Sequence, residues 1–137
     1  MAWRRGWNTG SGKYGNKKVE IDGETFDSLK EARRGKELEL MEQAGEIKNL
    51  RRQVRYELVP TIREPDSVGN RGGIHRGKVI ERGVDYVCDF EYIDCKTGEK
   101  IIEDVKGYRD TDSAAYKVFV IKRKIFLYKY GIRIKEV

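Results

Sequence analysis

The stretch that decides the fold is residues 83–107, which read GVDYVCDFEYIDCKTGEKIIEDVKG. Two segments in it, residues 83–94 and 100–107, carry the β-branched and aromatic residues typical of strands. The four residues from Cys95 to Gly98 separate these segments and favour a tight turn. We therefore predict an antiparallel hairpin.

Spacing along this hairpin brings charged residues together. If Asp94 pairs with Glu99 across the turn, Asp89 lies directly opposite Asp104. Directly paired residues share one face and hold their Cβ atoms about 5 Å apart. Lys106 follows Asp104 by two residues, so it projects from the same face. The sequence thus predicts two carboxylates and one ammonium at a single point.

This arrangement has a chemical interpretation and a structural one. Adjacent buried carboxylates repel each other unless a cation neutralises them, and their hard oxygen atoms suit Mg²⁺ or Mn²⁺. A nearby lysine could stabilise negative charge that develops in a reaction. The alternative is a solvated sheet face, because cross-strand pairs of aspartate and lysine are common in strands.

A helix is predicted before the hairpin, over residues 28–43. Ser28 is followed three residues later by Glu31, which is a capping-box pattern, and Gly45 is a suitable stop. Its expected buried stripe comprises Leu29, Ala32 and Leu40.

Three further features precede the hairpin. Residues 19–24 are predicted to form a short hairpin or turn, and residues 47–58 a strand that alternates with period two. Residues 60–82 have no clean period, so we expect a long loop. The cations of this loop favour a flap that faces DNA: Arg63, Arg71, Arg76, Lys78 and Arg82.

After the hairpin, Thr111 or Asp112 is expected to cap a second helix that ends at Tyr130 and is closed by Gly131. Residues 132–134 are predicted to form a last strand. The expected apolar face of this helix comprises Val118, Ile121, Ile125 and Tyr128. The predicted order is helix, three strands, helix, strand, which is an α/β domain with a mixed central sheet flanked by helices.

Charge indicates a polyanionic partner. The chain has 137 residues, a net charge of +6 and 38% charged residues, and it is long enough for one domain, residues 19–137. Residues 1–18 contain basic and aromatic residues among glycines and no acid, so we expect a flexible arm that contacts nucleic acid. The candidate phosphate contacts are Arg4, Arg5, Lys13, Lys17 and Lys18 of the arm, and Lys117 near the start of the second helix.

Several classes of site and location are disfavoured. His75 is the only histidine, and Cys88 and Cys95 do not form a Cys-x-x-Cys pair, so a zinc centre or a histidine-based triad is not expected. The N-terminus has no apolar segment typical of a signal peptide, and no run reaches the roughly 18 apolar residues of a membrane helix. We therefore expect a cytoplasmic protein without a membrane partner.

Three segments together resemble a known superfamily. Cys88-Asp89-Phe90 and Asp104-Val105-Lys106 follow a helix that begins Phe26-Asp27-Ser28-Leu29-Lys30-Glu31-Ala32. With the predicted order of elements, this combination resembles the PD-(D/E)xK nucleases, which include type II restriction enzymes, phage exonucleases and Holliday-junction resolvases. Over residues 13–137 the chain also resembles small phage proteins assigned to that superfamily.

The resemblance implies a fold and roles for four residues. It implies a restriction-endonuclease-like core in which Asp89 is the central metal ligand and Asp104 the second. Lys106 would be the catalytic lysine, and Glu31 would complete the metal site directly or through water. The cofactor would be Mg²⁺, with Mn²⁺ as a substitute. Because Glu103 adjoins Asp104, a shifted register could make Glu103 the ligand, although pairing parity favours Asp104.

The resulting functional hypothesis is a metal-dependent endodeoxyribonuclease for branched or recombining DNA, similar to a Holliday-junction resolvase. It would act in a phage-infected or lysogenic bacterial host. A nicking, restriction-like or homing endonuclease is one alternative. Others are a non-catalytic nucleic-acid-binding module and an interaction protein with a decayed nuclease fold. A resolvase should be a homodimer, formed through the apolar parts of residues 118–130 or through residues 19–24.

Overall fold

The protein is an α/β structure with one mixed central sheet. The computed structural model describes residues 18–107 and 111–137. Its elements are β1 (Val19–Ile21), β2 (Glu24–Phe26), α1 (Leu29–Gln43), β3 (Ile47–Val59), β4 (Ile62–Arg63), β5 (Ser67–Val68), β6 (Ile74–His75), β7 (Val79–Glu81), β8 (Val84–Asp94), β9 (Lys100–Asp104), α2 (Ala114–Tyr130) and β10 (Lys135–Glu136). In the described part of the chain, neither helix has the length and apolarity needed to cross a lipid bilayer.

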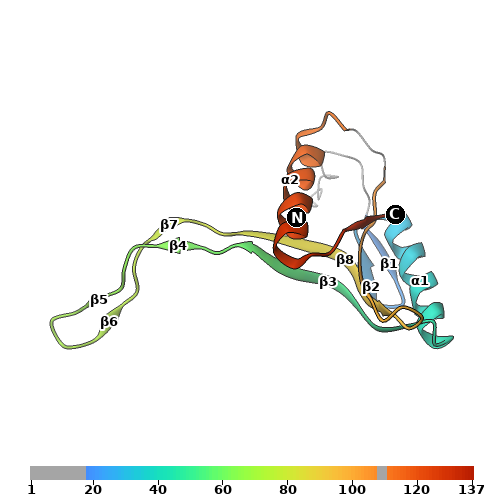
Figure 1. The fold of residues 1–137 in the computed structure, drawn as a ribbon, viewed down its shortest axis with the longest axis horizontal. Helices are drawn as coiled ribbons and strands as arrows, with labels where there is room; N and C mark the ends of the chain where they lie inside the picture. The colour runs from blue at the N-terminus through green and yellow to red at the C-terminus, as the bar shows by residue number, and fades with distance from the viewer. Residues whose placement is uncertain (1–17, 108–110) are drawn as a thin grey trace, which may run out of the picture.

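The central sheet has the strand order β10-β9-β8-β3. β10 pairs parallel to β9, and the other pairs are antiparallel. The predicted order of helix, three strands, helix and strand is confirmed for α1, β3, β8, β9, α2 and β10. α1 and α2 cover opposite faces of the sheet, because each packs on a separate core cluster (Figure 1).

Helix α1 begins and ends as predicted but buries a different stripe. Ser28 Oγ accepts a hydrogen bond from Glu31 N at 3.1 Å, and Gly45 has a left-handed φ of 78° just after the helix. Ala32 is buried as expected, but Leu29 and Leu40 are exposed. The face that packs on the sheet comprises Glu31, Ala32, Gly35 and Leu38. The prediction failed because apolar residues occur on both faces of this helix.

Helix α2 also buries a face other than the predicted one. Ser113, not Thr111 or Asp112, caps it, and Gly131 ends it with a φ of 70°. Its two buried residues are Phe119 and Phe126, which pack among the aromatic rings of the core. Of the stripe predicted from helical spacing, Ile125 packs against the core, but the other three are exposed: Val118 51%, Ile121 57% and Tyr128 93%. Two large aromatic side chains thus determine which face packs.

The last strand lies later than predicted. Residues 132–134 are not a strand; Ile132 and Ile134 pack against the core beneath α2. The chain reaches the edge of β9 only at Lys135, where β10 begins.

The segment 60–82 is not the unstructured loop that the sequence predicted. It continues β3 and β8 outward as a two-stranded ribbon in which β4 pairs with β7 and β5 pairs with β6. Figure 1 shows this ribbon projecting far from the helices. The short pairings and four glycines of this segment hid its strand character, since glycine is depleted in strands.

Candidate active site

The hairpin register predicted from the sequence is confirmed. Phe90 pairs with Glu103, and Ile93 with Lys100, which is the predicted register, and Asp89 and Asp104 are the residues just beyond the last pair. The ladder between β8 and β9 ends at this point. Asp89 Oδ2 instead accepts a hydrogen bond of 2.6 Å from the backbone N of Val105. The carboxylate of Asp89 therefore lies where the two strands separate.

The regular alternation of β8 side chains between the two faces of the sheet is interrupted at Asp89. Cys88 packs in the cluster beneath α2, whereas Phe90 packs in the cluster beneath α1. Both were expected in the core, but alternation alone would have placed them on one face. Gln53, which the flanking pairs place opposite Asp89, has a left-handed φ of 51° in the middle of β3. A left-handed non-glycine residue inside a strand is strained, and such strain tends to occur at functional sites.

Gln53 connects the acid of α1 to the acid of β8. Its Nε2 lies 3.0 Å from Glu31 Oε1 and 3.3 Å from Asp89 Oδ1. Glu31 is 3% exposed, and its other oxygen accepts a bond of 3.2 Å from Asp27 N. Arg52 approaches Glu31 only to 3.9 Å. The capping position of Glu31 therefore directs its carboxylate into this cluster.

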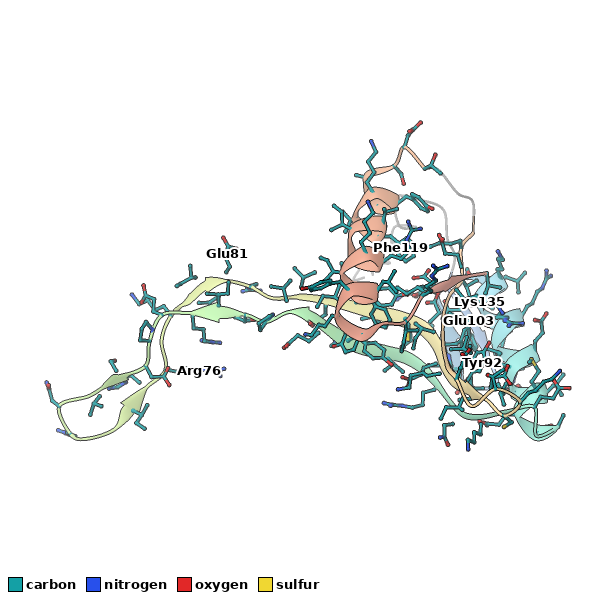
Figure 2. The ribbon with its side chains drawn as sticks, viewed as in Figure 1. Arg76, Glu81, Tyr92, Glu103, Phe119 and Lys135 are labelled. Carbon is teal, nitrogen blue, oxygen red and sulfur yellow. The ribbon has the colours of Figure 1, made fainter. Side chains whose placement is uncertain are left out.

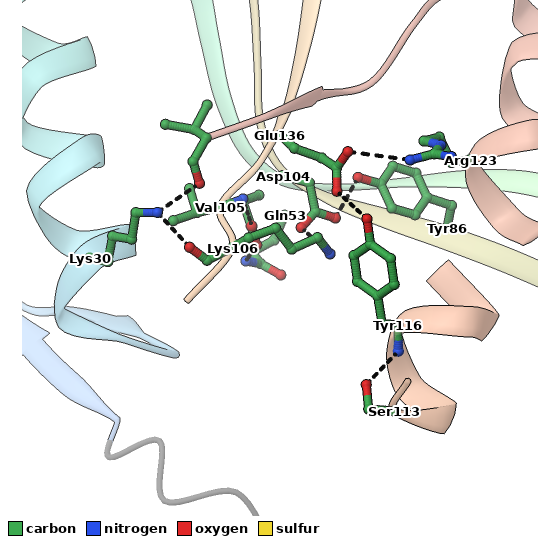
Figure 3. A network of polar contacts seen from close by, with 12 residues as sticks. Lys30, Gln53, Tyr86, Asp104, Val105, Lys106, Ser113, Tyr116, Arg123 and Glu136 are labelled. Atoms are coloured by element: carbon green, nitrogen blue, oxygen red, sulfur yellow. Dashed lines mark hydrogen bonds and ion pairs between the residues drawn. The ribbon is translucent and has the colours of Figure 1, made fainter. Parts of the chain in front are cut away.

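Asp104 lies between an aromatic hydroxyl and the predicted lysine. Tyr86, buried beneath α2, donates a hydrogen bond of 2.8 Å to Asp104 Oδ2. Lys106 Nζ is 2.8 Å from Asp104 Oδ1 and lies 3.3 Å from the ring centre of Phe119. Figure 3 shows Asp104 with Tyr86 and Lys106 around it. The structure thus holds both oxygens of this carboxylate.

The lysine that follows β9 is fixed from the α1 side through its backbone. Lys30 Nζ lies 2.5 Å from Lys106 O and 2.9 Å from Val137 O (Figure 3). Lys106 N also donates to Val137 O at 2.9 Å, and Val137 N donates to Asp104 O at 3.0 Å. The end of the chain therefore holds residues 104–106 in place.

The pKa values of two acids reflect this crowding. Burial, followed by the charges of Asp104 and Glu31, raises the pKa of Asp89 from 3.8 to about 7. The Val105 hydrogen bond and the Lys106 charge only partly oppose this rise. Burial, and then the charge of Asp27, also raises the pKa of Glu31. Ionising either acid is therefore costly, first because both are buried and then because other carboxylates lie near them.

Glu103 lies outside this cluster, on the α1 side of the sheet. Its side chain is fully buried and accepts hydrogen bonds of 2.9 and 2.6 Å from Arg34, and one of 2.6 Å from Tyr92. Lys135 approaches to 3.7 Å, and Figure 2 shows it with Tyr92 beside Glu103. Although burial alone would raise it, these bonds hold the pKa of Glu103 below its ordinary value. Of the two neighbouring acids, Asp104 is the one that faces Lys106.

Comparison with known proteins gives one result. A family model described as "Protein of unknown function (DUF1064)" matches residues 11–136. The chain belongs to the DUF1064 family. No curated protein matches it. No solved structure matches it either.

The carboxylates of this DUF1064 protein do not form a ready-made metal cage. Among residues 18–107 and 111–137, no three His, Cys, Asp or Glu side chains converge closely enough to hold an ion. Gln53 bonds to both Glu31 and Asp89, and Lys106 bonds to Asp104. These carboxylates are therefore paired with side-chain nitrogen atoms.

The predicted nucleic-acid contacts lie apart from the acids or outside the described part of the protein. Lys18 and Lys117 are exposed, and the side chain of neither makes a hydrogen bond or ion pair with a described residue. The other candidates lie outside the described residues: Arg4, Arg5, Lys13 and Lys17.

Sequence reasoning missed three residues of the DUF1064 site. Gln53 lies in a predicted strand, but a segment of 23 residues separates that strand from its partner, so their register could not be derived. Tyr86 was missed because it lies near the start of β8, beyond the last residue that pairs with β9, so the hairpin register does not place it beside Asp104. Lys30 carries the only detectable signal, because it adjoins Glu31 in the first turn of α1.

Proposed function

We propose that this protein is a metal-dependent endodeoxyribonuclease that hydrolyses phosphodiester bonds in branched or recombining DNA. The observation that carries the proposal is the chain of contacts where β8 and β9 separate: Gln53 bonds to Glu31 and Asp89, Asp89 accepts from Val105 N, and Lys106 pairs with the next acid, Asp104. The order of elements around this point supports a restriction-endonuclease-like core.

The donor chemistry fits a hard divalent ion. Asp89 and Asp104 would hold Mg²⁺, and Glu31 would complete the site directly or through water. Burial, and after it the charges of Asp104 and Glu31, raises the pKa of Asp89, so its ionised form is costly in the protein alone and a bound cation would offset that cost. When bound, the ion would polarise the phosphodiester and lower the pKa of a bound water. Mn²⁺ offers the same preference for oxygen ligands and is expected to substitute.

The protein's own residues would position these groups. Tyr86 and Gln53 orient the carboxylates of Asp104 and Asp89 through the hydrogen bonds described above. Lys106 presents an ammonium beside Asp104, where it would stabilise negative charge developing on a phosphate oxygen. A protein that only bound nucleic acid would need none of these buried acids.

A substrate panel tests the proposal. The full chain is incubated with labelled linear duplex, single strand, flap, fork and four-way junction, in Mg²⁺ and in EDTA. We expect cleavage only with Mg²⁺, with branched duplexes cut in preference to linear ones. The Asp104→Asn variant is the matched control and should cut none of them. Failure to cut every substrate in Mg²⁺ and in Mn²⁺ would contradict the proposal.

A further inference from the structure

The ribbon, residues 60–82, has no packing partner among the described residues that accounts for its length. Its residues are exposed except for Gly69 and Gly77, which are half-buried. Two-stranded hairpins alone are marginally stable in water. Figure 2 shows Arg76 and Glu81 on the ribbon, well away from the helices. A surface of this shape is suited to contact another molecule.

Over residues 18–137 of the sequence, the excess of cations over acids falls within the ribbon segment. The ribbon has five cations and three acids, whereas residues 18–59 and 83–137 together have 20 of each. Within the ribbon, residues 69–82 hold four cations and one acid. These four cations form no ion pair with any described residue: Arg71, Arg76, Lys78 and Arg82. A ligand with closely spaced negative charges is their natural complement.

The two strands of the ribbon approach each other closely at Gly77, which lies between Arg76 and Lys78. A Cβ added to Gly77 would lie 1.7 Å from Glu64 O, so only glycine allows this approach of the two backbones. Asp66 Oδ1 accepts a hydrogen bond of 2.8 Å from Gly77 N, and Arg63 donates one of 3.1 Å to Gly77 O. A two-stranded ribbon fits the major groove of B-DNA, which is about 12 Å wide.

The ribbon begins within reach of the candidate site. β8 runs from Asp89 back to Val84, which spans about 17 Å at roughly 3.3 Å per residue. That is about half of the 34 Å turn of a DNA duplex. A duplex held at Asp89 could therefore extend along the base of the ribbon.

We propose that the ribbon lies in a groove of duplex DNA, with Arg71, Arg76 and Lys78 on phosphates. This inference rests on the proposed function, because the ligand is the DNA that the site would cut. The pair Val68 and Ile74 near the tip, 75% and 77% exposed, would contact sugars and base edges. The alternative partner for the ribbon is a second copy of this chain. The excess of cations on the ribbon disfavours it, because two such ribbons would repel each other.

Salt dependence of binding tests this inference. Fluorescence anisotropy measures the affinity of the full chain for a labelled duplex of about 30 base pairs, in EDTA, across about 50 to 200 mM salt. The Arg76→Gln/Lys78→Gln variant should bind more weakly. Its slope of log affinity against log salt should be shallower by about 1.8, or about 0.9 for each lost phosphate contact.

The matched control removes two exposed lysines at the opposite end of the sheet. Lys48→Gln/Lys96→Gln removes the same charge and should leave the slope unchanged. An unchanged slope in the ribbon variant, or an equal loss in the control, would overturn the inference. A change in oligomeric mass with an unchanged slope would assign the ribbon to a second copy instead. Binding in EDTA requires no cleavage, so failure of the nuclease proposal would remain distinguishable.

Discussion

Asp89 accepts hydrogen bonds from Val105 and Gln53 while lying close to two other carboxylates. Its pKa rises from 3.8 to about 7 on folding, mainly through burial. A carboxyl group with a raised pKa contributes stability below its unfolded pKa, and that stability is lost as pH rises through the folded pKa. Ionisation of Asp89 should therefore lower the free energy of unfolding progressively between about pH 4 and pH 7.

Asp89→Asn should remove this loss of stability. In EDTA at pH 8 we expect the variant to be more stable than the wild type, by up to about 4 kcal/mol. The difference should vanish near pH 4. Thermal unfolding across this range measures it, and Asp85→Asn is the control because Asp85 lies on the same strand, paired with Arg55. Equal stabilities at pH 8 would show that Asp89 is not electrostatically strained.

Gln53 is the strained residue of the site. Gln53→Ala and Gln53→Gly both remove the amide that bonds to Glu31 and Asp89, so both should slow DNA cleavage to a similar extent. They should differ in stability, because alanine retains the cost of a left-handed φ whereas glycine does not. We expect Gln53→Gly to be the more stable of the two by about 1 kcal/mol in denaturant unfolding. Equal stabilities would argue against strain at this position.

At the scale of elements, β9 directs neighbouring acids to opposite faces. Glu103 is fully buried against Arg34 of α1, and Asp104 faces Tyr86 beneath α2. Glu103→Gln should cost up to about 3 kcal/mol, because the fully buried carboxylate loses its charge beside the half-buried guanidinium of Arg34. The molecules that still fold should keep their cleavage activity. Asp104→Asn should cost less, about 1 to 2 kcal/mol, because asparagine can still accept the Tyr86 hydrogen bond although it loses the Lys106 pair, and it should abolish cleavage.

Urea unfolding and cleavage assays on these two variants separate the roles. Arg34→Lys is a useful companion to Glu103→Gln, because it keeps the charge but loses the two-point contact. If Glu103→Gln folded normally and cut nothing, Glu103 would be the ligand and the assignment of Asp104 would be wrong.

Elements were predictable from sequence where a local rule determined them. The four-residue turn determined the hairpin register, and Ser28 and Gly131 determined one end of each helix. The buried helix faces were not predictable, since both faces carry apolar residues and the sheet selects between them. In α2 the sheet selects the face with Phe119 and Phe126.

The candidate site was predictable only where a local rule places its residues. Asp89, Asp104 and Lys106 follow from one short turn, so pairing parity places them together. Gln53 depends on the pairing of β3 with β8 across the ribbon, and no local rule sets that register. Its left-handed backbone has no signal in the sequence, because glutamine has no preference for that conformation.

For the whole molecule, we expect a homodimer. The described residues of one chain form one candidate site, whereas resolving a four-way junction requires two symmetric cuts. The exposed apolar residues of α2, Val118, Ile121 and Tyr128, are a candidate interface. Light scattering coupled to size-exclusion chromatography should give about twice 15.9 kDa.

An interface variant provides the control for this prediction. Ile121→Lys should shift the mass to that of one chain without lowering the unfolding temperature of the monomer. A wild-type protein that is monomeric at working concentrations would remove the resolvase proposal and leave the broader nuclease proposal in place.

The most direct test of the central claim is single-turnover cleavage of a labelled four-way junction by the wild type and by Lys106→Ala, each in Mg²⁺ and in EDTA. The account predicts cleavage by the wild type in Mg²⁺ alone and a rate at least about 100-fold lower for Lys106→Ala, the scale of losing one charge-stabilising donor. Equal rates for the two proteins, or cleavage that persists in EDTA, would contradict it.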